Sequence, residues 1–534
     1  MVSTLAAALL AALGLSGPSA THAAPPSGAT FFVSGHGWGH GVGLAQYGAY
    51  GYALHGWLAD DIVAHYYPGT DLGQAPVKRV RVLLVPGSKR VVVSSRSPFS
   101  VRDAAGKTHK LAAGKQELGP GLKLKLAASA KALPGPLVFS PGSAPLALGD
   151  RGYRGTLRVT GGKAVRVVNT VGLEPYLWGV VPSEMPDTWP TEALKSQAIV
   201  ARTYALTHMQ GGGDFDVYPD TRSQVYGGMP AESDSARAAV NDTSGEVVLY
   251  KGELAQTFFF SSSGGRTANV QDVWGGSKAT PYLVSVPDPY DTLSPYHDWG
   301  PLKISGQQLG NRLGSRGTLL DVRASAAADG RVRSLTLIGS KGDRTVSGSS
   351  ARAALGLRST WFTIGTLSLT QPADRTVEYG AQTHLTGLAR GIPRVTLESR
   401  PYGGEWKTLA VLKSRGGTVT ATLSPKVTTD YRISSGIARS AVVRLSVAPS
   451  VRLTASSDRT AVTGLVKPLL PGAAVQVQRQ GNGGAWTTVS TANVTADGAF
   501  EASVDLTPGS YRARVVAGKG FAAGLSPVLT VVPA

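Results

Sequence analysis

The sequence contains no cysteine, so disulfide bonds and metal sites with thiolate ligands are both excluded. It also lacks a long apolar run beyond its first residues, which predicts a soluble, globular mature protein. Basic residues outnumber acidic ones by 53 to 34, for a formal net charge of +19. The Lys and Arg residues are nevertheless scattered over all regions, with no basic run and no alternation with aromatic residues. The charge is then either a diffuse contribution to solubility or, for an exported protein, a sign of an anionic partner other than nucleic acid, such as the cell wall.

The first residues form a short apolar segment that ends in small residues. Residues 5–15 are apolar, and Gly17, Pro18 and small residues follow as far as Ala23, where we expect cleavage. The pattern predicts a secretory signal peptide at residues 1–23, although its start carries no Lys or Arg. A retained membrane anchor is the alternative, but the apolar run is short for a membrane span.

A single carboxylate, Glu184, lies in a Pro-Ser-Glu-Met-Pro stretch. Pro182 and Pro186 restrict the backbone on either side of it, which predicts a tight turn. Glu184 is then either a solvated or capping residue or a positioned general acid/base, which requires a fixed carboxyl with a tuned pKa.

A helix is predicted directly after this turn, with Asp187 or Thr188 as its N-cap and Pro190 in its first turn. Lys195 and Arg202 are seven residues apart and share a face beside its apolar stripe. The helix N-terminus and these cations would lower the pKa of Glu184, so we expect the pKa to rise only when bound glycan desolvates the carboxyl. The apolar stripe consists of Leu194, Ala198, Ala201 and Ala205.

A second informative block begins with a predicted strand at residues 30–33 and continues into a glycine-rich loop, in which His36 and His40 flank Trp38. Helices are predicted to follow at residues 44–55 and 60–66. Two histidines four apart could bind a metal on a helix, but five glycines argue against a helix here. We therefore predict no metal site, and Trp38 offers a face on which a sugar could stack.

Residues 173–206 closely resemble the catalytic segment of the SpoIID/LytB family, the sporulation stage II protein D domain. The glycine-rich block resembles that family's G-x-G-W-G-H-G-x-G-x-x-Q-x-G-A motif. In the sporulation protein this motif follows the catalytic Glu, whereas here it precedes Glu184 by about 140 residues, so the chain resembles a rearranged member. Further matches to the family occur at residues 153–173, 224–228, 256–267, 272–276 and 282–291.

The resemblance implies an exported peptidoglycan lytic transglycosylase that cleaves the MurNAc-GlcNAc bond with Glu184 as its only acid/base. Hydrolysis would usually require a second carboxylate, and the matched motifs supply only one strong candidate. No metal or cofactor is implied. The residues expected to position the sugar are Lys195, Arg202, Gln224, Ser262, Ser263, His36, Trp38 and His40.

Other members of the family are described as enhancers of a cell-wall amidase. The alternative is therefore a non-catalytic wall protein whose partner is an N-acetylmuramoyl-L-alanine amidase. A relict domain with neither activity is a third possibility. In the first two cases the partner is peptidoglycan, with a secreted, cell-wall-associated location and a role in wall remodelling or sporulation.

The remaining chain is rich in predicted strands. Residues 77–170 alternate in short apolar runs and predict a β-rich subdomain, and residues 256–267 predict a buried strand. Residues 367–534 contain a repeat in which Trp406 lies 80 residues before Trp486, and both tryptophans are predicted to be core residues.

We therefore predict an α+β chain: a SpoIID-like catalytic domain followed by two small all-β sandwiches of Ig-like type. The predicted domains are 24–366, 367–448 and 449–534.

Overall fold

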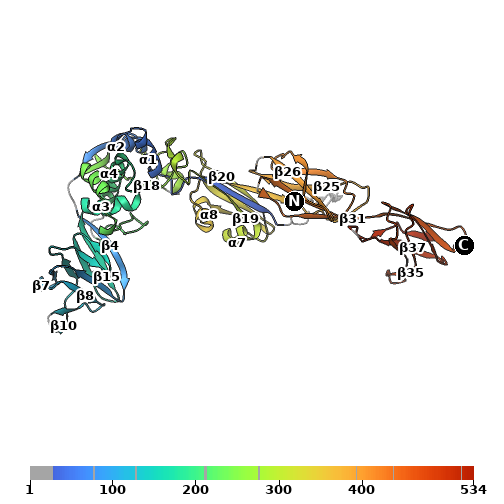
Figure 1. Cartoon of the computed structure of the whole chain (residues 1–534), viewed down its shortest axis with the longest axis horizontal. Coiled ribbons are helices and arrows are strands. Elements are labelled where there is room, and N and C mark those ends of the chain that lie inside the picture. The colour runs from blue at the N-terminus through green and yellow to red at the C-terminus, as the bar shows by residue number, and fades with distance from the viewer. Residues whose placement is uncertain are drawn as a thin grey trace, which may run out of the picture.

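The computed structural model describes residues 28–75, 79–126, 129–209, 213–274, 277–392, 394–436, 438–518 and 520–533. The predicted signal peptide lies outside these ranges. The described parts form an elongated molecule, in which a helical cluster carries a β-rich lobe on one side and a row of further β domains on the other (Figure 1). Among the described helices, none is both long and apolar enough to span a lipid bilayer.

The lobe below the helical cluster in Figure 1 is built from antiparallel strands. In chain order these are β4 (Arg79–Ser88), β5 (Val91–Ser95), β6 (Phe99–Arg102), β7 (Thr108–Leu111), β8 (Gly114–Leu118), β9 (Lys123–Leu126), β10 (Ser129–Ala132), β11 (Leu137–Ser140), β12 (Leu146–Leu148), β13 (Arg151–Tyr153), β14 (Thr156–Thr160) and β15 (Val165–Gly172). One sheet has the order β4-β15-β14-β11-β6-β7, a second has the order β13-β12-β5-β8, and β9 and β10 form a hairpin. Inward side chains of both sheets join one apolar core, as their alternation predicts.

The helical cluster is organised around one central helix, α4 (Thr191–Thr207). Thirteen of its 17 residues are buried, so it is surrounded rather than packed on a single apolar face. The other elements of the cluster are β2 (Leu44–Ala45), α1 (Gln46–Leu54), α2 (Ala59–Tyr66), β3 (Asp71–Gln74), α3 (Leu173–Glu184), the 3-10 helix η1 (Met229–Ala231), α5 (Asp234–Asp242), β16 (Glu246–Tyr250), β17 (Glu253–Leu254), β18 (Phe259–Phe260), α6 (Val270–Val273) and the 3-10 helix η2 (Asp291–Leu293).

The predicted turn around Glu184 is wrong, because Glu184 is the last residue of α3. Pro182 lies inside that helix, where it removes one backbone hydrogen bond, and the burial of the preceding turns outweighs this loss. The helix ends at Glu184 because Pro186 forces Met185 into an extended conformation.

The predicted N-cap of the next helix is also wrong. The helix begins at Thr191 with Pro190 as its N-cap, and neither Asp187 nor Thr188 belongs to it. Pro190 disfavours helical angles at Trp189, so the helix cannot extend further back.

The predicted strand at residues 256–267 shrinks to two residues. Only Phe259–Phe260 pairs as a strand, in parallel with Leu44–Ala45. Because Leu44 and Ala45 pair as a strand, the helix predicted to begin at residue 44 begins at Gln46 instead.

Strand β1 (Thr30–His36) lies between β19 (Asp298–Ser305) and β23 (Phe362–Leu369). Phe31 and Val33 point into the core beneath these strands, whereas Phe32 between them points into the core of the first sandwich. The other elements of this middle unit are α7 (Gly306–Leu313), β20 (Leu319–Ala326), β21 (Val332–Gly339), β22 (Gly342–Ser347) and α8 (Gly348–Leu355).

The boundary predicted at residue 366 falls inside β23, which pairs with β1 on one side and with a strand of the next domain on the other. One sheet therefore joins the N-terminal strand to the first sandwich.

Two sandwiches complete the chain. The first contains β24 (Thr376–Glu378), β25 (Thr383–Arg390), β26 (Val395–Pro401), β27 (Lys407–Leu412), β28 (Thr418–Leu423), β29 (Thr429–Ser435), β30 (Ala438–Arg439) and β31 (Val443–Ala448). The second contains β32 (Ser450–Ala455), β33 (Ala461–Lys467), β34 (Ala474–Gln480), β35 (Trp486–Asn493), β36 (Ala499–Ser503), β37 (Gly509–Val516), β38 (Gly524–Leu525) and β39 (Leu529–Val531). In the second, the sheet β32-β33-β36 accompanies the sheet β35-β34-β37-β38, with β39 also paired to β37. The Tyr511 hydroxyl donates to the Thr507 carbonyl at 3.0 Å, the tyrosine corner of Ig-like sandwiches.

The predicted core role of the repeated tryptophans is wrong. Trp406 and Trp486 are only partly buried and belong to neither sandwich core. The Arg432 guanidinium carbon lies 3.9 Å from the Trp406 ring centroid, and that of Arg512 lies 4.2 Å from Trp486. These cation–π stacks cover one ring face of each tryptophan on the outside of its sheet.

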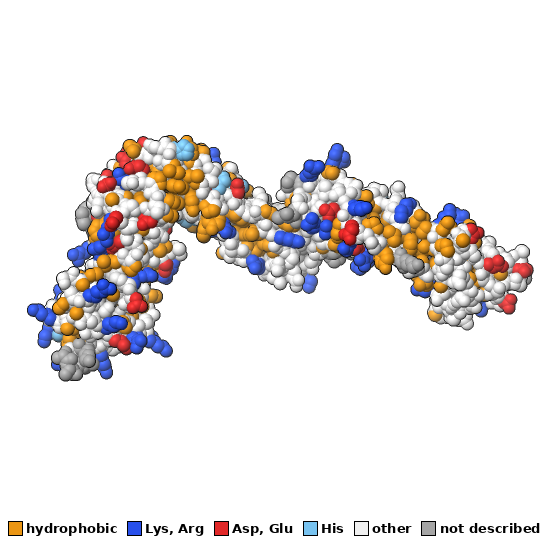
Figure 2. Space-filling view, viewed as in Figure 1, with side chains coloured by type: hydrophobic (Ala, Val, Ile, Leu, Met, Phe, Trp, Pro, Cys, Tyr) orange, Lys and Arg blue, Asp and Glu red, His pale blue; other side chains and the backbone are white. Residues whose placement is uncertain are grey.

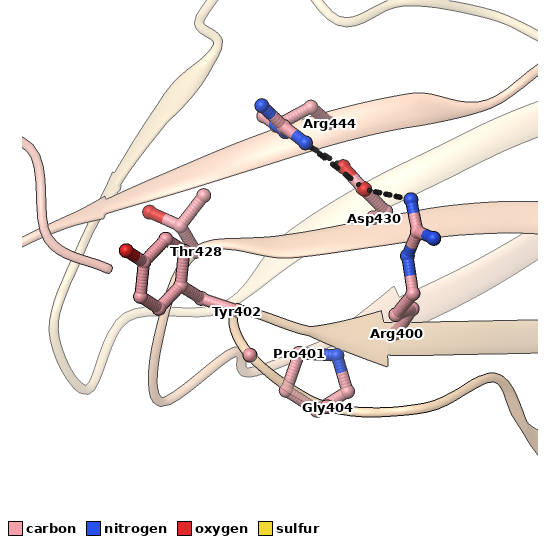
Figure 3. Close-up of a pocket in the computed structure, with 8 residues that line it drawn as sticks. Arg400, Pro401, Tyr402, Gly404, Thr428, Asp430 and Arg444 are labelled. Carbon is pink, nitrogen blue, oxygen red and sulfur yellow. Dashed lines mark hydrogen bonds and ion pairs between the residues drawn. The ribbon is translucent and has the colours of Figure 1, made fainter. Parts of the chain in front are cut away.

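A pocket of about 260 Å³ lies at the edge of the first sandwich. In Figure 3 the guanidinium groups of Arg400 and Arg444 converge on the carboxylate of Asp430, and both pairs are closer than 3.0 Å. This ion network ties three neighbouring strands together, and the pocket contains no side chain arranged for acid/base chemistry.

Candidate active site

A cleft of about 790 Å³ opens beside the helical cluster, and segments far apart in the sequence line it. The glycine-rich loop forms one wall of the cleft. The end of α3 and residues 221–223 form a second wall, and α8 of the middle unit forms a third. The lining residues are Trp38, Gly39, His40, Gln46, Ser183, Glu184, Tyr204, Thr221, Arg222, Ser223, Phe258, Phe259, Phe260, Ser261, Trp274 and Arg352.

Glu184 enters this cleft from the last turn of α3. The Val225 N–H donates to its Oε1 atom at 2.7 Å, which fixes the carboxyl. Burial raises the pKa of Glu184 above its ordinary value of 4.5, and the hydrogen bonds from Val225 and Gln46 oppose this only in part. The negative end of the α3 dipole lies at the same point and also disfavours the carboxylate. The expectation that only bound glycan would raise this pKa is therefore wrong.

Trp38 presents an aromatic face to the cleft. Its side chain is 43% exposed, and its ring meets Tyr296 edge-on at a centroid distance of 4.5 Å. The backbone of Trp38 exchanges two hydrogen bonds with Ser262, at 2.8 and 3.0 Å. Ser262 thus holds the tryptophan in place through its main chain.

His40 lines the cleft, and its Nδ1 accepts from the Val42 N–H at 3.1 Å. Burial and the charge of Arg352 lower the pKa of His40 to about 4, and a backbone hydrogen bond at Phe259 opposes this only in part, so the ring is neutral at physiological pH. Its bond to Val42 holds the glycine-rich loop, and the ring carries no charge for binding a sugar.

Two predicted cations do not reach the cleft. Lys195 pairs with Glu192 at 3.2 Å and Asp242 at 3.4 Å on a different side of α4. The Arg202 guanidinium is fully buried and pairs with both carboxylate oxygens of Glu174, at 2.9 and 2.6 Å. The sequence placed both on one helix face, but that face does not meet the cleft: Arg202 is enclosed by the protein, and Lys195 is partly exposed away from the cleft lining.

Gln224 and His36, two further residues predicted to position the sugar, lie outside the cleft lining. Gln224 is buried, donating to the Ala201 carbonyl and accepting from the Tyr176 hydroxyl, both at 3.1 Å. His36 binds Asp298 at 2.5 Å, outside the cleft lining.

Ser262 and Ser263 are both held by the buried carboxylate of Asp291. The Ser262 hydroxyl and the Ser263 N–H each donate to it at 2.8 Å. Neither serine lines the cleft through its side chain, so their contribution is to the shape of the loop.

No motif in the sequence pointed to Arg352, which lies on α8 of the middle unit and lines the cleft. Its Nε donates to the Leu357 carbonyl at 3.3 Å, and burial lowers its pKa. Arg222, the other cation of the lining, is already paired with Asp220 at 2.7 Å. Within the part of the chain that the structure describes, Arg352 forms no ion pair and Glu184 is the only carboxylate among the lining residues.

Metal binding has no support from this geometry. Among the described residues, no group of three or more His, Asp or Glu side chains converges closely enough to hold an ion. Among the described residues, the cleft therefore combines one acid, one cation without an ion pair (Arg352), one paired cation (Arg222) and exposed aromatic surface.

These features define a multidomain protein with a helical core, Ig-like appendages and a single-carboxylate cleft. Residues 161–250 match the family model described as SpoIID, Stage II sporulation protein. This matched part of the chain includes Glu184 and α4.

Curated relatives carry names consistent with that family. The chain is 41% identical over 134 residues to an "Amidase enhancer" of Bacillus subtilis, covering 25% of this chain and 17% of that protein. It is 36% identical over 145 residues to "Stage II sporulation protein D" of the same species, covering 24% and 42%. The protein of that name from Bacillus amyloliquefaciens is 32% identical over 216 residues, covering 36% and 60%. The chain thus spans between about a sixth and three fifths of the length of these relatives.

Solved structures resemble the chain only weakly. A two-domain fibronectin type-III segment of chicken tenascin aligns with 31% of this chain and 97% of its own, at 15% identity and a TM-score of 0.20. The human OSCAR ligand-binding domain gives a TM-score of 0.14 at 16% identity, covering 30% of this chain and 96% of its own. The Ig-like assignment therefore rests on the strand order and the tyrosine corner described above.

Proposed function

We propose that this protein is an exported lytic transglycosylase that cleaves the MurNAc-GlcNAc bond of peptidoglycan. The observation that carries the proposal is the single carboxyl of the cleft, Glu184, whose pKa burial raises. A hydrolase normally needs a second carboxylate to supply a nucleophile or activate water. A transglycosylase needs only one, because the substrate's own C6 hydroxyl attacks.

In the proposed reaction, protonated Glu184 donates its proton to the glycosidic oxygen as the bond to C1 of MurNAc breaks. The GlcNAc hydroxyl leaves, and positive charge develops on the MurNAc ring. The Glu184 carboxylate then removes the proton from the C6 hydroxyl, whose oxygen bonds to C1 and closes the 1,6-anhydro ring. The proton returns to Glu184, and no water is consumed.

The proposal is tested by the ends of the product. Purified peptidoglycan incubated with the protein should yield fragments that terminate in 1,6-anhydro-muramic acid, identified by mass spectrometry. Reducing ends would show hydrolysis and would contradict the proposed chemistry.

The pH dependence of cleavage follows from the raised pKa of Glu184. As a general acid Glu184 must be protonated, so kcat/KM should fall as pH rises through its pKa, with the limb displaced above the ordinary value of 4.5. Initial rates measured on soluble glycan across the pH range test this. A profile with no limb above pH 5 would argue against Glu184 as the acid.

Arg352 is expected to bind a carboxylate of the substrate, such as the lactyl group of a muramic acid residue that carries no stem peptide, or a carboxylate of a stem peptide. Replacing it in an Arg352→Gln variant should raise KM by about tenfold or more with a smaller change in kcat, because hydrogen bonds to charged groups contribute roughly 1.5–3 kcal/mol. The exposed Arg323 of β20 provides a matched control, and its Gln variant should leave KM unchanged. Equal KM values for both variants would remove Arg352 from substrate recognition.

A second candidate function is supported by one relative, the "Amidase enhancer". In that case the protein would bind peptidoglycan and stimulate a cell-wall amidase without cleaving glycan itself. Stimulation of amidase that survives in the Glu184→Gln variant, with no anhydro products from either form, would favour this function. Both functions place the protein outside the cell at the wall.

A further inference from the structure

The β-rich lobe carries an uneven share of the charge of this chain. Residues 77–170 contain 18 Lys and Arg but only three Asp and Glu, and thus supply most of the net charge of +19. Cations occur along the whole chain, but this lobe holds 18 of the 53 Lys and Arg in less than a fifth of the residues, and acidic residues are nearly absent from it. Figure 2 shows Lys and Arg side chains projecting from several sides of this lobe, which lies at the lower left.

A groove of about 530 Å³ lies within this lobe, between β7, β8 and the β9–β10 hairpin. Lys110, Lys115 and Lys131 line it, all three with exposed side chains, and no Asp or Glu is among its lining residues. Within the described ranges none of these lysines forms an ion pair.

Two of the three acids of the lobe are already engaged. Glu117 pairs with Arg90 at 3.1 Å, and Asp103 pairs with the mostly buried His109 at 2.9 Å. The three ammonium groups therefore repel one another without an internal counter-charge, and an anion in the groove would relieve this repulsion.

The kind of anion follows from what surrounds the lysines. Phe99, Phe139 and Tyr153 are all buried, and the mostly buried His109 ring of the groove is held by Asp103, so none of these rings is available to stack on a nucleobase. Among the described residues of the lobe, no large hydrophobic side chain is exposed for contact with an acyl chain. An ammonium is a point charge without the planar fork of a guanidinium, so it binds a phosphate without requiring one orientation, as the phosphates of a flexible chain need.

We propose that this groove binds a linear phosphodiester polymer without bases, of the polyol phosphate kind. The lobe projects from the helical cluster that contains the cleft (Figure 1), so the polymer would hold the protein at a surface while the cleft remains open. This inference is independent of the proposed catalytic function, because the groove shares no lining residue with the cleft.

Binding of the full mature chain to purified poly(glycerol phosphate) tests the proposal, measured by calorimetry at two salt concentrations. The wild type and the Glu184→Gln variant should bind equally, and more weakly as salt rises. A triple variant, Lys110→Gln with Lys115→Gln and Lys131→Gln, should lose about tenfold or more in affinity and show a weaker salt dependence.

The matched control removes three exposed cations from the first sandwich, as Lys407→Gln with Lys413→Gln and Arg415→Gln. This variant has the same net charge as the groove variant and should keep its affinity within about twofold. Equal losses in the two triple variants would overturn the proposal, since only net charge would then matter. Tighter binding to single-stranded DNA or to polyglutamate, at equal charge concentration, would also overturn it by identifying a different polymer.

Discussion

Replacing Glu184 with glutamine should reduce the rate of glycan cleavage by about 10² to 10⁴-fold, the usual contribution of a general acid. Glutamine preserves the size of the side chain and can still accept the Val225 N–H bond, but it cannot donate a proton to the glycosidic oxygen. Release of 1,6-anhydro ends, quantified by mass spectrometry under single-turnover conditions, measures the loss.

Two controls separate catalysis from folding in this experiment. Asp187 is an exposed carboxylate three residues away, and an Asp187→Asn variant should keep its activity because Asp187 does not line the cleft. The raised pKa of Glu184 means that its ionisation opposes folding as pH rises above 4.5, so the Glu184→Gln variant should be at least as stable as the wild type at neutral pH. Retained cleavage in the glutamine variant would exclude Glu184 as the acid.

Replacing Arg202 with methionine should destabilise the helical cluster by about 3–5 kcal/mol, the usual effect of breaking a buried ion pair. The fully buried guanidinium pairs with Glu174 and also donates to the carbonyls of Val240 and Glu246, both at 3.1 Å. These bonds join α4 to α3, α5 and β16, and the variant would leave the Glu174 carboxylate unpaired. Urea denaturation followed by tryptophan fluorescence measures the change.

Lys195 on the same helix is the matched comparison. Its ion pairs are partly exposed, so a Lys195→Met variant should lose only about 1 kcal/mol or less. A stable Arg202→Met protein that binds glycan poorly would instead support the sugar-positioning role that the sequence predicted for Arg202.

The resemblance to the SpoIID family could be recognised from the sequence, because a match over many consecutive residues is specific; the role of Glu184 as the acid stays a prediction. Alternation of apolar residues likewise predicted the strands of the β-rich lobe, since a period of two requires only neighbouring residues. The match to the SpoIID family model over residues 161–250 confirms the first of these. Local backbone preferences were less reliable, and the proline stretch around Glu184 proved to be helical because packing of α3 outweighed the cost of Pro182.

The roles of the polar residues around Glu184 could not be predicted in the same way. Spacing places Lys195 and Arg202 on one helix face, but it does not say whether that face meets solvent or protein. The prediction that Trp406 and Trp486 are core residues was wrong for a similar reason. Strand periodicity does not reveal which side of a sheet will face the second sheet.

The sequence by itself determined the chemistry available to this protein: one carboxyl in a family-specific segment, a glycine-rich loop carrying Trp38, and an excess of positive charge without cysteine. Only the tertiary structure decided that the loop after β1 would lie against residues 258–263. It also decided that α8 would add Arg352 to the same cleft. The physical reason is that a residue's pKa and its partners depend on burial and on contacts between segments far apart in the chain, which no local pattern records.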